Sequence, residues 1–488
     1  MTFNSYIFIL AFLPIFVILY FLSIKTGKFI SKYVIIIGSI IFYVYAGWDV
    51  TCIFGLSVIT NLALSFLAEK KRPQKYPLVL AIIFNIGLLF YFKYLNFTID
   101  IINNISQLSI KKSKFLLPLG ISFFTFQEIM YIVSVWNKSI NKVHIIDYFA
   151  YILYFPKLIM GPLMEPMDFI IQINDAEKRK LDWRNIASGI KLFSLGLFKK
   201  VVLADTFARA VSWGFTTGVI PSGSGLTATS GDLFLVMLFY TFQIFFDFSG
   251  YSDMAVGASL MINILLPINF DSPYKALSIR DFWKRWHISL TNFFTKYVYF
   301  PLGGSRNGSC RTYMNIMIIF LISGIWHGAN WTFILWGFIH GFLQCLERSF
   351  QKKWHKFNIL FKWSCTFLMV NILWLLFRTD NIKQWVEMLI AMFSFANMKI
   401  SDGLVKAFVL PESTFLFDKL NFIHANINVK TFSMLLFTAL SFFVCLVPAN
   451  NYKNMRKFNW FNMIICSIAF IWGFLCLGTE SVFVYFNF

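Results

Sequence analysis

Long apolar runs recur throughout this 488-residue chain, and they constrain its fold more than any other feature. A helix that crosses a bilayer needs about 20 predominantly apolar residues. Because some runs are short or interrupted, we expect roughly ten to twelve spans at that length, in an all-α, polytopic integral membrane protein. The candidate spans are 6–23, 33–47, 50–68, 77–95, 145–160, 187–203, 232–247, 250–267, 312–326, 331–346, 360–377, 430–447 and 459–477.

The composition favours one membrane-embedded unit over several soluble domains. Hydrophobic residues make up 58% of the chain and charged residues only 14%, whereas soluble domains carry about 25% charged residues. The first apolar run, 6–23, lacks the basic start and the small-residue cleavage site of a signal peptide, so we interpret it as a retained span.

The formal charge of +20 does not indicate nucleic-acid binding. The basic residues stand in short clusters between apolar runs, such as 70–72 and 111–114, as they do in the loops of membrane proteins. No segment resembles a nucleic-acid reading helix or a stacking sheet. The expected partner is therefore a lipid bilayer and not a nucleic acid.

The basic loops also predict the orientation of the chain. Cytoplasmic loops are enriched in Lys and Arg, and basic residues follow the first and third spans, so the N-terminus is predicted to lie outside. Lys453, Arg456 and Lys457 precede the last span and no basic residue follows it. This pattern predicts an external C-terminus and an even number of crossings. The cluster 111–114 would lie outside in this scheme, against the rule.

The middle third of the chain differs from its two ends. Between residues 116 and 345, Gly, Pro and ionisable residues interrupt the apolar runs, as in Phe155-Pro-Lys157 and Pro301-Leu-Gly-Gly304. Broken backbone at membrane depth occurs only where protein buries it or a wet cavity adjoins it. We therefore expect N-terminal transmembrane helices at 1–115, a cavity-lining core at 116–345 and C-terminal transmembrane helices at 346–488.

The stretch 278–297 has the features of one amphipathic helix. Ser278 followed by Asp281 is a capping pattern, and Pro301 with the next glycines would end the helix. Aromatic and basic residues separate onto different faces at 100° per residue, which predicts a helix at the cytoplasmic interface. His287 lies at the edge of the aromatic face, where it is either functional or an interfacial histidine that only forms hydrogen bonds.

His327 is the stronger candidate for chemistry. If a helix begins near Tyr313, a rise of about 1.5 Å per residue places His327 about 21 Å along it, inside a hydrocarbon core of about 30 Å. An ionisable residue at that depth is a functional candidate by default, and the alternative is a buried histidine that a neighbouring helix satisfies. An imidazole, with an ordinary pKa of about 6.5, suits general-base work. No second histidine or carboxylate stands at metal-ligand spacing, so we expect no metal site.

A third group of polar residues lies within one predicted span. Tyr240, Gln243 and Asp247 recur at helical spacing and share one face. A buried Asp is costly unless it is paired or faces water. The three residues either line a polar path for substrate or clamp neighbouring helices together, and Gln127 and Glu128 pose the same alternative.

Five motifs, in order along the chain, resemble the membrane-bound O-acyltransferase superfamily. They are Leu117-Pro-Leu-Gly-Ile-Ser-Phe-Phe-Thr-Phe-Gln127, Phe246-Asp-Phe-Ser-Gly-Tyr-Ser-Asp-Met-Ala-Val-Gly257, Phe282-Trp-Lys-Arg-Trp-His-Ile-Ser-Leu290, Pro301-Leu-Gly-Gly-Ser-Arg306 and Trp326-His-Gly-Ala-Asn-Trp331. Within that superfamily the chain is similar to the bacterial alginate O-acetyltransferase branch, which includes peptidoglycan O-acetyltransferases. The resemblance covers most of the chain and is densest at 116–345.

The resemblance implies a fold and a set of site residues. A helical funnel should hold the catalytic His327 at its narrow neck, with His287 as a second catalytic histidine. No bound cofactor is expected, and acetyl-CoA or another acyl thioester would be the donor substrate. The candidate substrate-binding residues are Asn330, Asp247, Gln243, Tyr240, Trp286 and Trp326.

The implied reaction is O-acetylation across the cytoplasmic membrane of a bacterium. His327 would act as general base on an acceptor hydroxyl. The acceptor would be an extracytoplasmic polysaccharide, for which a composition typical of an AT-rich genome favours peptidoglycan over an alginate-like polymer. An extracytoplasmic, acetyltransferase- or esterase-like partner protein would complete the transfer. Two alternatives remain: D-alanyl transfer to teichoic acid, and a non-enzymatic transporter of polysaccharide precursors.

Overall fold

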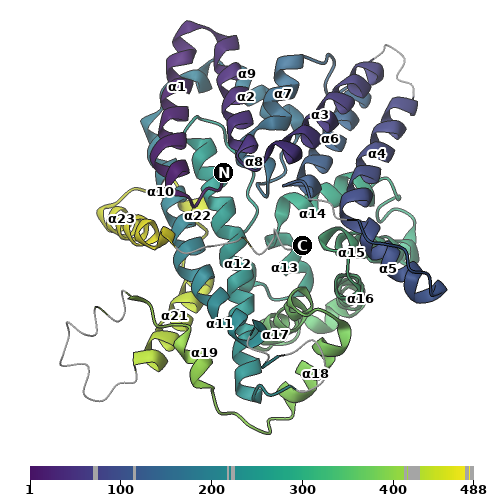
Figure 1. Ribbon diagram of the computed structural model, residues 1–488, viewed down its shortest axis with the longest axis vertical. Helices are drawn as coiled ribbons and strands as arrows, with labels where there is room; N and C mark the ends of the chain where they lie inside the picture. The colour runs from purple at the N-terminus through teal and green to yellow at the C-terminus, as the bar shows by residue number, and fades with distance from the viewer. Residues whose placement is uncertain are drawn as a thin grey trace. The chain divides into compact units, whose positions relative to one another are not determined.

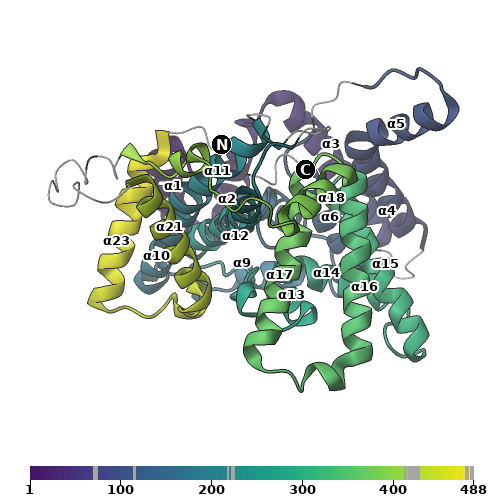
Figure 2. The same cartoon turned by 90° about the horizontal axis from the view of Figure 1, so that it is seen from below.

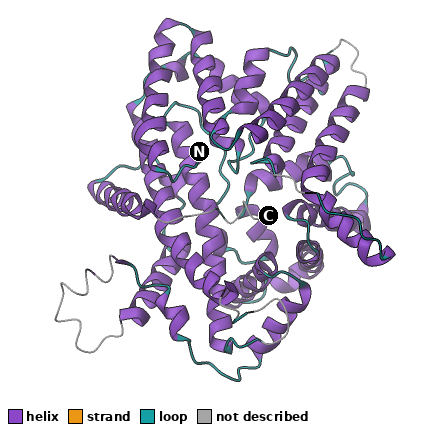
Figure 3. Cartoon of the chain, in the orientation of Figure 1, coloured by secondary structure: helices purple, strands orange, loops and turns teal. Residues whose placement is uncertain are grey.

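The computed structural model describes residues 1–69, 75–113, 117–216, 219–220, 226–411, 415, 429–478 and 483. This described part consists of helices and loops and contains no strand (Figures 1 and 3). The all-α prediction is confirmed. The basic residues at 70–72 and Lys114, used above for orientation, lie outside the described residues.

Eight helices of the described chain are long and apolar enough to cross a membrane. Two shorter apolar helices, Phe29–Val44 and Ile121–Trp136, accompany them, so the eight alone fall below the predicted ten to twelve. The eight are Phe8–Thr26, Trp48–Ala68, Lys75–Ser106, Ser230–Leu260, Gly308–His327, Ile359–Arg378, Val429–Leu446 and Trp460–Gly478.

Two compact units divide the chain, and neither is continuous in sequence. The first comprises Met1–Gly196, Tyr251–Ile268 and Asn454–Phe470, and the second comprises Leu197–Gly250, Asn269–Lys453 and Ile471–Phe488. This division into two units differs from the predicted division into three segments, and the three segments remain a prediction.

In the first unit, α1 packs against α2, and α3, α4 and α6 pack against one another (Figure 1). Its helices are α1 (Leu13–Thr26), α2 (Lys28–Val44), α3 (Trp48–Ala68), α4 (Lys75–Leu89), α5 (Leu95–Ser106), α6 (Ile121–Trp136), α7 (Ile145–Leu153), α8 (Phe155–Leu158), α9 (Pro166–Asn174) and α10 (Trp183–Leu197), to which α23 (Trp460–Leu475) adds its first part.

The second unit holds the residues that the motifs single out. Its helices are α11 (Asp205–Thr216), α12 (Ser230–Leu260) as far as Gly250, α13 (Ile279–Arg285), α14 (Ile288–Phe294), α15 (Gly308–His327), α16 (Trp331–Trp354), α17 (Ile359–Arg378), α18 (Ile382–Phe393), α19 (Asp402–Lys406), α21 (Val429–Leu446) and the short α22 (Asn451–Asn454), which ends at the unit boundary.

Two predicted spans, 232–247 and 250–267, prove to be largely one helix, α12. Gly250 does not end the helix, because the cost of an interior glycine, about 1 kcal/mol relative to alanine, is small beside the packing of an almost fully buried helix. Further along α12, Gly257 serves close packing within the first unit, where its carbonyl oxygen would lie 2.6 Å from a Cβ added at Gly189.

The predicted span 145–160 is also wrong as a single helix. It breaks at Tyr154, whose ψ of 104° is not helical, and resumes as the short α8. Pro156 explains the interruption, because it has no N–H to continue the hydrogen-bond pattern of α7.

Polar side chains inside the first unit clamp its helices. The carboxylate of Glu128 on α6 accepts hydrogen bonds from Ser57 at 2.8 Å and Asn61 at 2.9 Å, both on α3. Gln127 is bonded to the buried Lys157 of α8. For Gln127 and Glu128, these contacts agree with the clamp alternative.

Candidate active site

His327 is the last residue of α15 and lies at the tip of a helical hairpin. Gly328 adopts an extended conformation, and α16 then returns beside α15 (Figure 2). The helix begins at Gly308, five residues before the predicted start at Tyr313. The chain turns directly after His327, so the helix ends one residue beyond the predicted span 312–326.

Aromatic rings enclose His327, whose exposed fraction is only 4%. The imidazole centroid lies 4.9 Å from Trp326, 5.1 Å from Trp336 of α16 and 5.1 Å from Phe377 of α17. Trp336 meets it edge to face, with an interplanar angle of 86°. Three helices therefore bury the imidazole within an aromatic cluster.

Asn330 fixes the turn of the hairpin. Its side-chain oxygen accepts a hydrogen bond from the Thr332 N–H at 3.1 Å and so caps α16. Its amide nitrogen donates to the Asp380 carbonyl at 2.9 Å. Both ends of the amide are thus engaged in holding the hairpin against the end of α17.

The predicted amphipathic helix 278–297 is interrupted at His287. The capping of its start is confirmed, since the Ser278 side chain accepts a hydrogen bond from the Asp281 N–H. The helix ends at Arg285, however, and α14 begins only at Ile288. His287 between them has φ 46° and ψ 51°, the left-handed conformation that non-glycine residues rarely adopt.

Asn269 holds this unusual conformation in place. Its backbone carbonyl accepts a hydrogen bond from the Ile288 N–H at 3.0 Å. Its side-chain oxygen accepts two more from Ser289, one from the N–H at 3.2 Å and one from the hydroxyl at 2.6 Å. The break therefore depends on residues beyond the helical pattern, and strained backbone of this kind is often found at functional sites.

His287 is even more buried than His327, at 1% exposure. Its ring lies 4.7 Å from Phe248 of α12 and 6.3 Å from Trp326. Trp326 thus contacts both histidines. Burial lowers the pKa of His287 from its ordinary 6.5 to about 3, so its imidazole is neutral at physiological pH.

Trp286 continues the aromatic cluster on the other side of the break. It lies 5.0 Å from Phe270 and 4.8 Å from Trp374 of α17. It is fully buried, like Trp336 and Trp374. The aromatic face of the amphipathic pattern therefore packs inside the protein.

Asp247 forms part of a buried ion-pair network. It lies 2.6 Å from the Lys200 ammonium, which also contacts Asp205 at 2.9 Å. Lys200 is 1% exposed and Asp247 2%. Since the next residue, Phe248, contacts His287, the ion pair anchors the part of α12 that contacts this histidine.

Tyr240 and Gln243 lie on the same helix as Asp247 and are also buried. In the described part of the chain, the Tyr240 hydroxyl and the Gln243 side-chain oxygen have no hydrogen-bond partner. Buried polar atoms are normally bonded. These two atoms could therefore meet a polar substrate or water.

Two buried residues that contact this region were not predicted as site residues from the sequence. His340, fully buried on α16, accepts a hydrogen bond from the Trp283 indole at 3.2 Å and lies 4.8 Å from Trp336. The spacing of Trp336 and His340, four residues apart on one helix, was an available signal. Lys200 was the other, and no local pattern marks it as the partner of Asp247.

The chemistry available at this cluster is that of buried imidazoles among aromatic rings. Within the described ranges, no group of three His, Cys, Asp or Glu side chains could hold a metal ion. A neutral imidazole can accept a proton from a hydroxyl, which makes His327 a candidate for this role.

Helices of membrane-spanning length and a buried histidine pair define a candidate membrane-embedded transferase. Residues 40–380 match the family model for MBOAT, the membrane-bound O-acyltransferase family. The match covers more than two thirds of the chain. The chain belongs to this family and is an O-acyltransferase.

Three relatives whose names state an activity are similar to this chain. A peptidoglycan O-acetyltransferase of Helicobacter pylori is 34% identical over 100% of this chain and 98% of its own length. A probable alginate O-acetylase of Pseudomonas aeruginosa is 37% identical over 82% of this chain and 76% of its own. A teichoic acid D-alanyltransferase of Bacillus subtilis is 28% identical over 50% and 61%.

Proposed function

We propose that the protein transfers an acetyl group from a cytoplasmic thioester, acetyl-CoA, to a hydroxyl on the outer side of the bacterial cytoplasmic membrane, for O-acetylation of peptidoglycan. The end-to-end similarity to a peptidoglycan O-acetyltransferase is the observation that carries this proposal. The alginate O-acetylase is similar over a smaller share of both chains, so an alginate-like polymer is the second choice of acceptor.

His327 acts as the general base in this scheme. Its imidazole takes the proton of the acceptor hydroxyl while the oxygen attacks the thioester carbonyl carbon. The C–S bond then breaks, and the leaving sulfur takes the proton back from the imidazolium, giving an ester and a free thiol. Proton transfer of this kind contributes about 10²–10⁴ in rate.

The developing oxyanion needs a hydrogen-bond donor. Backbone N–H groups beside Gly328 are the first candidates, because this residue leaves the helix directly after His327. Asn330 is a second candidate, but its amide would have to give up the bond to the Asp380 carbonyl.

His287 would orient the donor as a neutral imidazole. A ring that burial keeps uncharged can donate one hydrogen bond and accept another. Tyr240 and Gln243, with their unbonded buried oxygens, would contact the substrate on the α12 side. The aromatic walls, including Trp286 and Trp326, would exclude water that otherwise hydrolyses the thioester.

The proposal includes a partner and an orientation. We infer that both termini face outwards, as the basic loops predict, and that an extracytoplasmic partner protein carries the acetyl group on to the polymer. D-alanyl transfer is the alternative, supported by similarity over half of this chain. The precursor-transporter alternative is less favoured, since the family is one of acyltransferases.

The test measures ester-linked acetyl groups on purified peptidoglycan by mass spectrometry. The measurement compares a strain from which the gene is deleted with the same strain expressing the wild-type chain, the His327→Ala variant or the His355→Ala variant. We expect the acetylation of peptidoglycan in the strain with His327→Ala to be at least about 100-fold lower than with the wild-type chain, at the level of the deletion strain. The exposed His355 serves as the matched control and should support normal acetylation.

Each contrary outcome points to a different error. Normal acetylation with His327→Ala would refute the catalytic role of this histidine. Unchanged peptidoglycan in the deletion strain, with loss of acetyl from an exported polysaccharide, would refute the acceptor. Loss of ester-linked D-alanine from teichoic acid in place of acetyl would establish the alternative reaction.

A further inference from the structure

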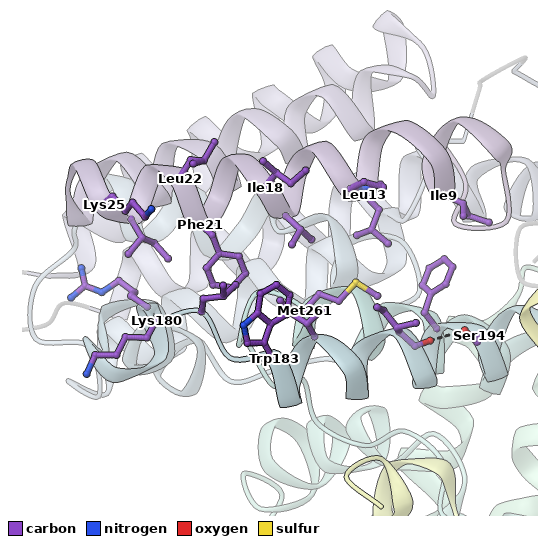
Figure 4. Close-up of a pocket in the computed structure, with 18 of the residues that line it drawn as sticks. Ile9, Leu13, Ile18, Phe21, Leu22, Lys25, Lys180, Trp183, Ser194 and Met261 are labelled. Atoms are coloured by element: carbon purple, nitrogen blue, oxygen red, sulfur yellow. Dashed lines mark hydrogen bonds between the residues drawn. The ribbon is translucent and has the colours of Figure 1, made fainter. Parts of the chain in front are cut away.

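A groove in the first unit is lined by none of the residues of the histidine cluster. It has a volume of about 830 Å³ and runs between α1 and α10, with Met261 and Phe470 also in its wall. Figure 4 shows Phe21, Trp183 and Met261 between the two helices. Its volume is within the range of about 300–1,000 Å³ typical of ligand sites.

The walls of the groove are apolar along most of its length. They are formed by aliphatic and aromatic side chains, of which Ile18, Leu22 and Ile190 are more than half exposed. Leu13 and Lys25 lie twelve residues apart on α1, about 18 Å at 1.5 Å per residue. One leaflet contributes about 15 Å of hydrocarbon, so the groove has the length of a lipid tail.

The groove ends in a cluster of cations. Lys25, Arg179 and Lys180 lie in its lining, and the described lining contains no carboxylate. Figure 4 shows Lys25 and Lys180 at the same end. Lys180 also pairs with Glu177 at 2.8 Å, but both side chains are exposed, and such a pair contributes little. A phosphate could therefore replace the Glu177 carboxylate.

Trp183 places this end at the level of lipid headgroups. It is 71% exposed and lies in the lining close to Arg179 and Lys180 in sequence. Exposed tryptophans beside Lys and Arg are typical of the boundary between hydrocarbon and water. The cationic end therefore belongs at the interface and the apolar length within the hydrocarbon.

We propose that this groove is a binding site for one anionic phospholipid, whose phosphate lies among Lys25, Arg179 and Lys180 and whose tail lies between α1 and α10. The charge complementarity selects an anionic headgroup, since basic pockets between membrane helices bind such lipids. This site is independent of the acyl-transfer reaction.

The test uses native mass spectrometry of the full-length, detergent-purified chain, titrated with phosphatidylglycerol or with phosphatidylcholine of the same tails. The wild-type chain should bind phosphatidylglycerol more tightly than phosphatidylcholine. A triple variant should bind phosphatidylglycerol at least about tenfold more weakly and phosphatidylcholine as before; its substitutions are Lys25→Gln, Arg179→Gln and Lys180→Gln. This size follows from a several-fold effect for each basic residue near a membrane surface.

Two further variants control the result. The Lys352→Gln, Lys353→Gln, Lys356→Gln triple removes the same charge from exposed positions of the second unit and should leave binding unchanged. Ile18→Trp fills the apolar part of the groove and should weaken both lipids. If the first triple variant does not fold, single variants at the exposed positions, Lys25→Gln and Lys180→Gln, should each bind phosphatidylglycerol severalfold more weakly than the wild type.

Three results would overturn the proposal. They are equal affinity of the wild type for the two lipids, undiminished phosphatidylglycerol binding by the Lys25, Arg179 and Lys180 variants, and an equal loss in the control triple variant.

Discussion

At the scale of single residues, the candidate site depends on buried histidines, of which His287 is kept neutral by burial. His287 is held in a left-handed backbone conformation and surrounded by rings from other segments. Its motif could be recognised in the sequence, but its conformation could not, because a helical pattern continues smoothly through residues 278–297. The hydrogen bonds that Ser289 donates to the Asn269 side chain decide the break.

The lowered pKa of His287 predicts a pH-dependent stability. Between pH 6.5 and 3 the unfolded chain binds this proton and the folded chain does not, so the free energy of unfolding decreases as the pH falls through that window. The effect is about 1.4 kcal/mol per pH unit. Thermal unfolding in detergent at pH 7.5 and pH 5 should show a smaller acid-induced decrease in Tm for His287→Gln than for wild type.

Substitution of the exposed His355 by Gln is the control for this measurement and should leave the pH difference of the wild type intact. An equal acid-induced decrease for wild type and His287→Gln would show that another group is responsible.

Removal of Lys200 from its buried ion pairs should strongly destabilise the protein. Lys200→Met leaves the carboxylates of Asp205 and Asp247 without the cation that pairs with both, and removal of one partner of a buried pair costs about 3–5 kcal/mol. Asp247→Asn should cost less, because Asp205 still pairs with Lys200. Detergent-solubilised variants can be compared by thermal unfolding.

The matched comparison is Lys180→Met, which breaks the exposed pair with Glu177 and should change stability by no more than about 1 kcal/mol. A smaller loss for Lys200→Met than for Asp247→Asn would contradict the assignment of Lys200 as the central member of the network.

At the scale of elements, the hairpin of α15 and α16 places His327. Gly324 and Gly337 let the two helices approach closely, since a Cβ at Gly324 would lie 3.2 Å from the Gly337 Cα and would collide with the Phe333 carbonyl oxygen. The neighbouring backbone cannot move away as a flexible side chain can. The local sequence does not show that these two glycines face each other, because they lie on different helices.

Gly324→Ala should therefore separate the hairpin and displace His327 from its aromatic neighbours. We expect the free energy of unfolding to decrease by about 1–3 kcal/mol, the usual cost of overpacking. Acetyl transfer should decrease by at least about tenfold. Thermal unfolding and the peptidoglycan acetyl assay measure the two effects. Gly87→Ala on α4, where an added Cβ meets nothing within 4 Å, should lower neither quantity and should stabilise the helix by up to about 1 kcal/mol. Equal losses for the two substitutions would contradict the close-packing role of Gly324.

At the scale of the whole molecule, the basic loops predict a topology that the fold alone does not settle. An even number of crossings with both termini outside follows from the basic residues after the first span and before the last. A reporter that is active only outside the cytoplasmic membrane should therefore be active when fused to either end. A cytoplasmic fluorescent reporter at the same positions is the control, and activity of the external reporter at only one end would require an odd number of crossings.

The sequence by itself determined the all-α membrane class and the family, and it singled out candidate site residues, because apolar runs of spanning length and contiguous motifs are local in the chain. The tertiary structure decided what those residues contact. It placed His327 at a hairpin tip, broke the predicted helix at His287, merged most of two predicted spans into α12 and paired Asp247 with Lys200. These features depend on hydrogen bonds, ring contacts and charges between segments far apart in sequence, and a local pattern contains no information about such partners.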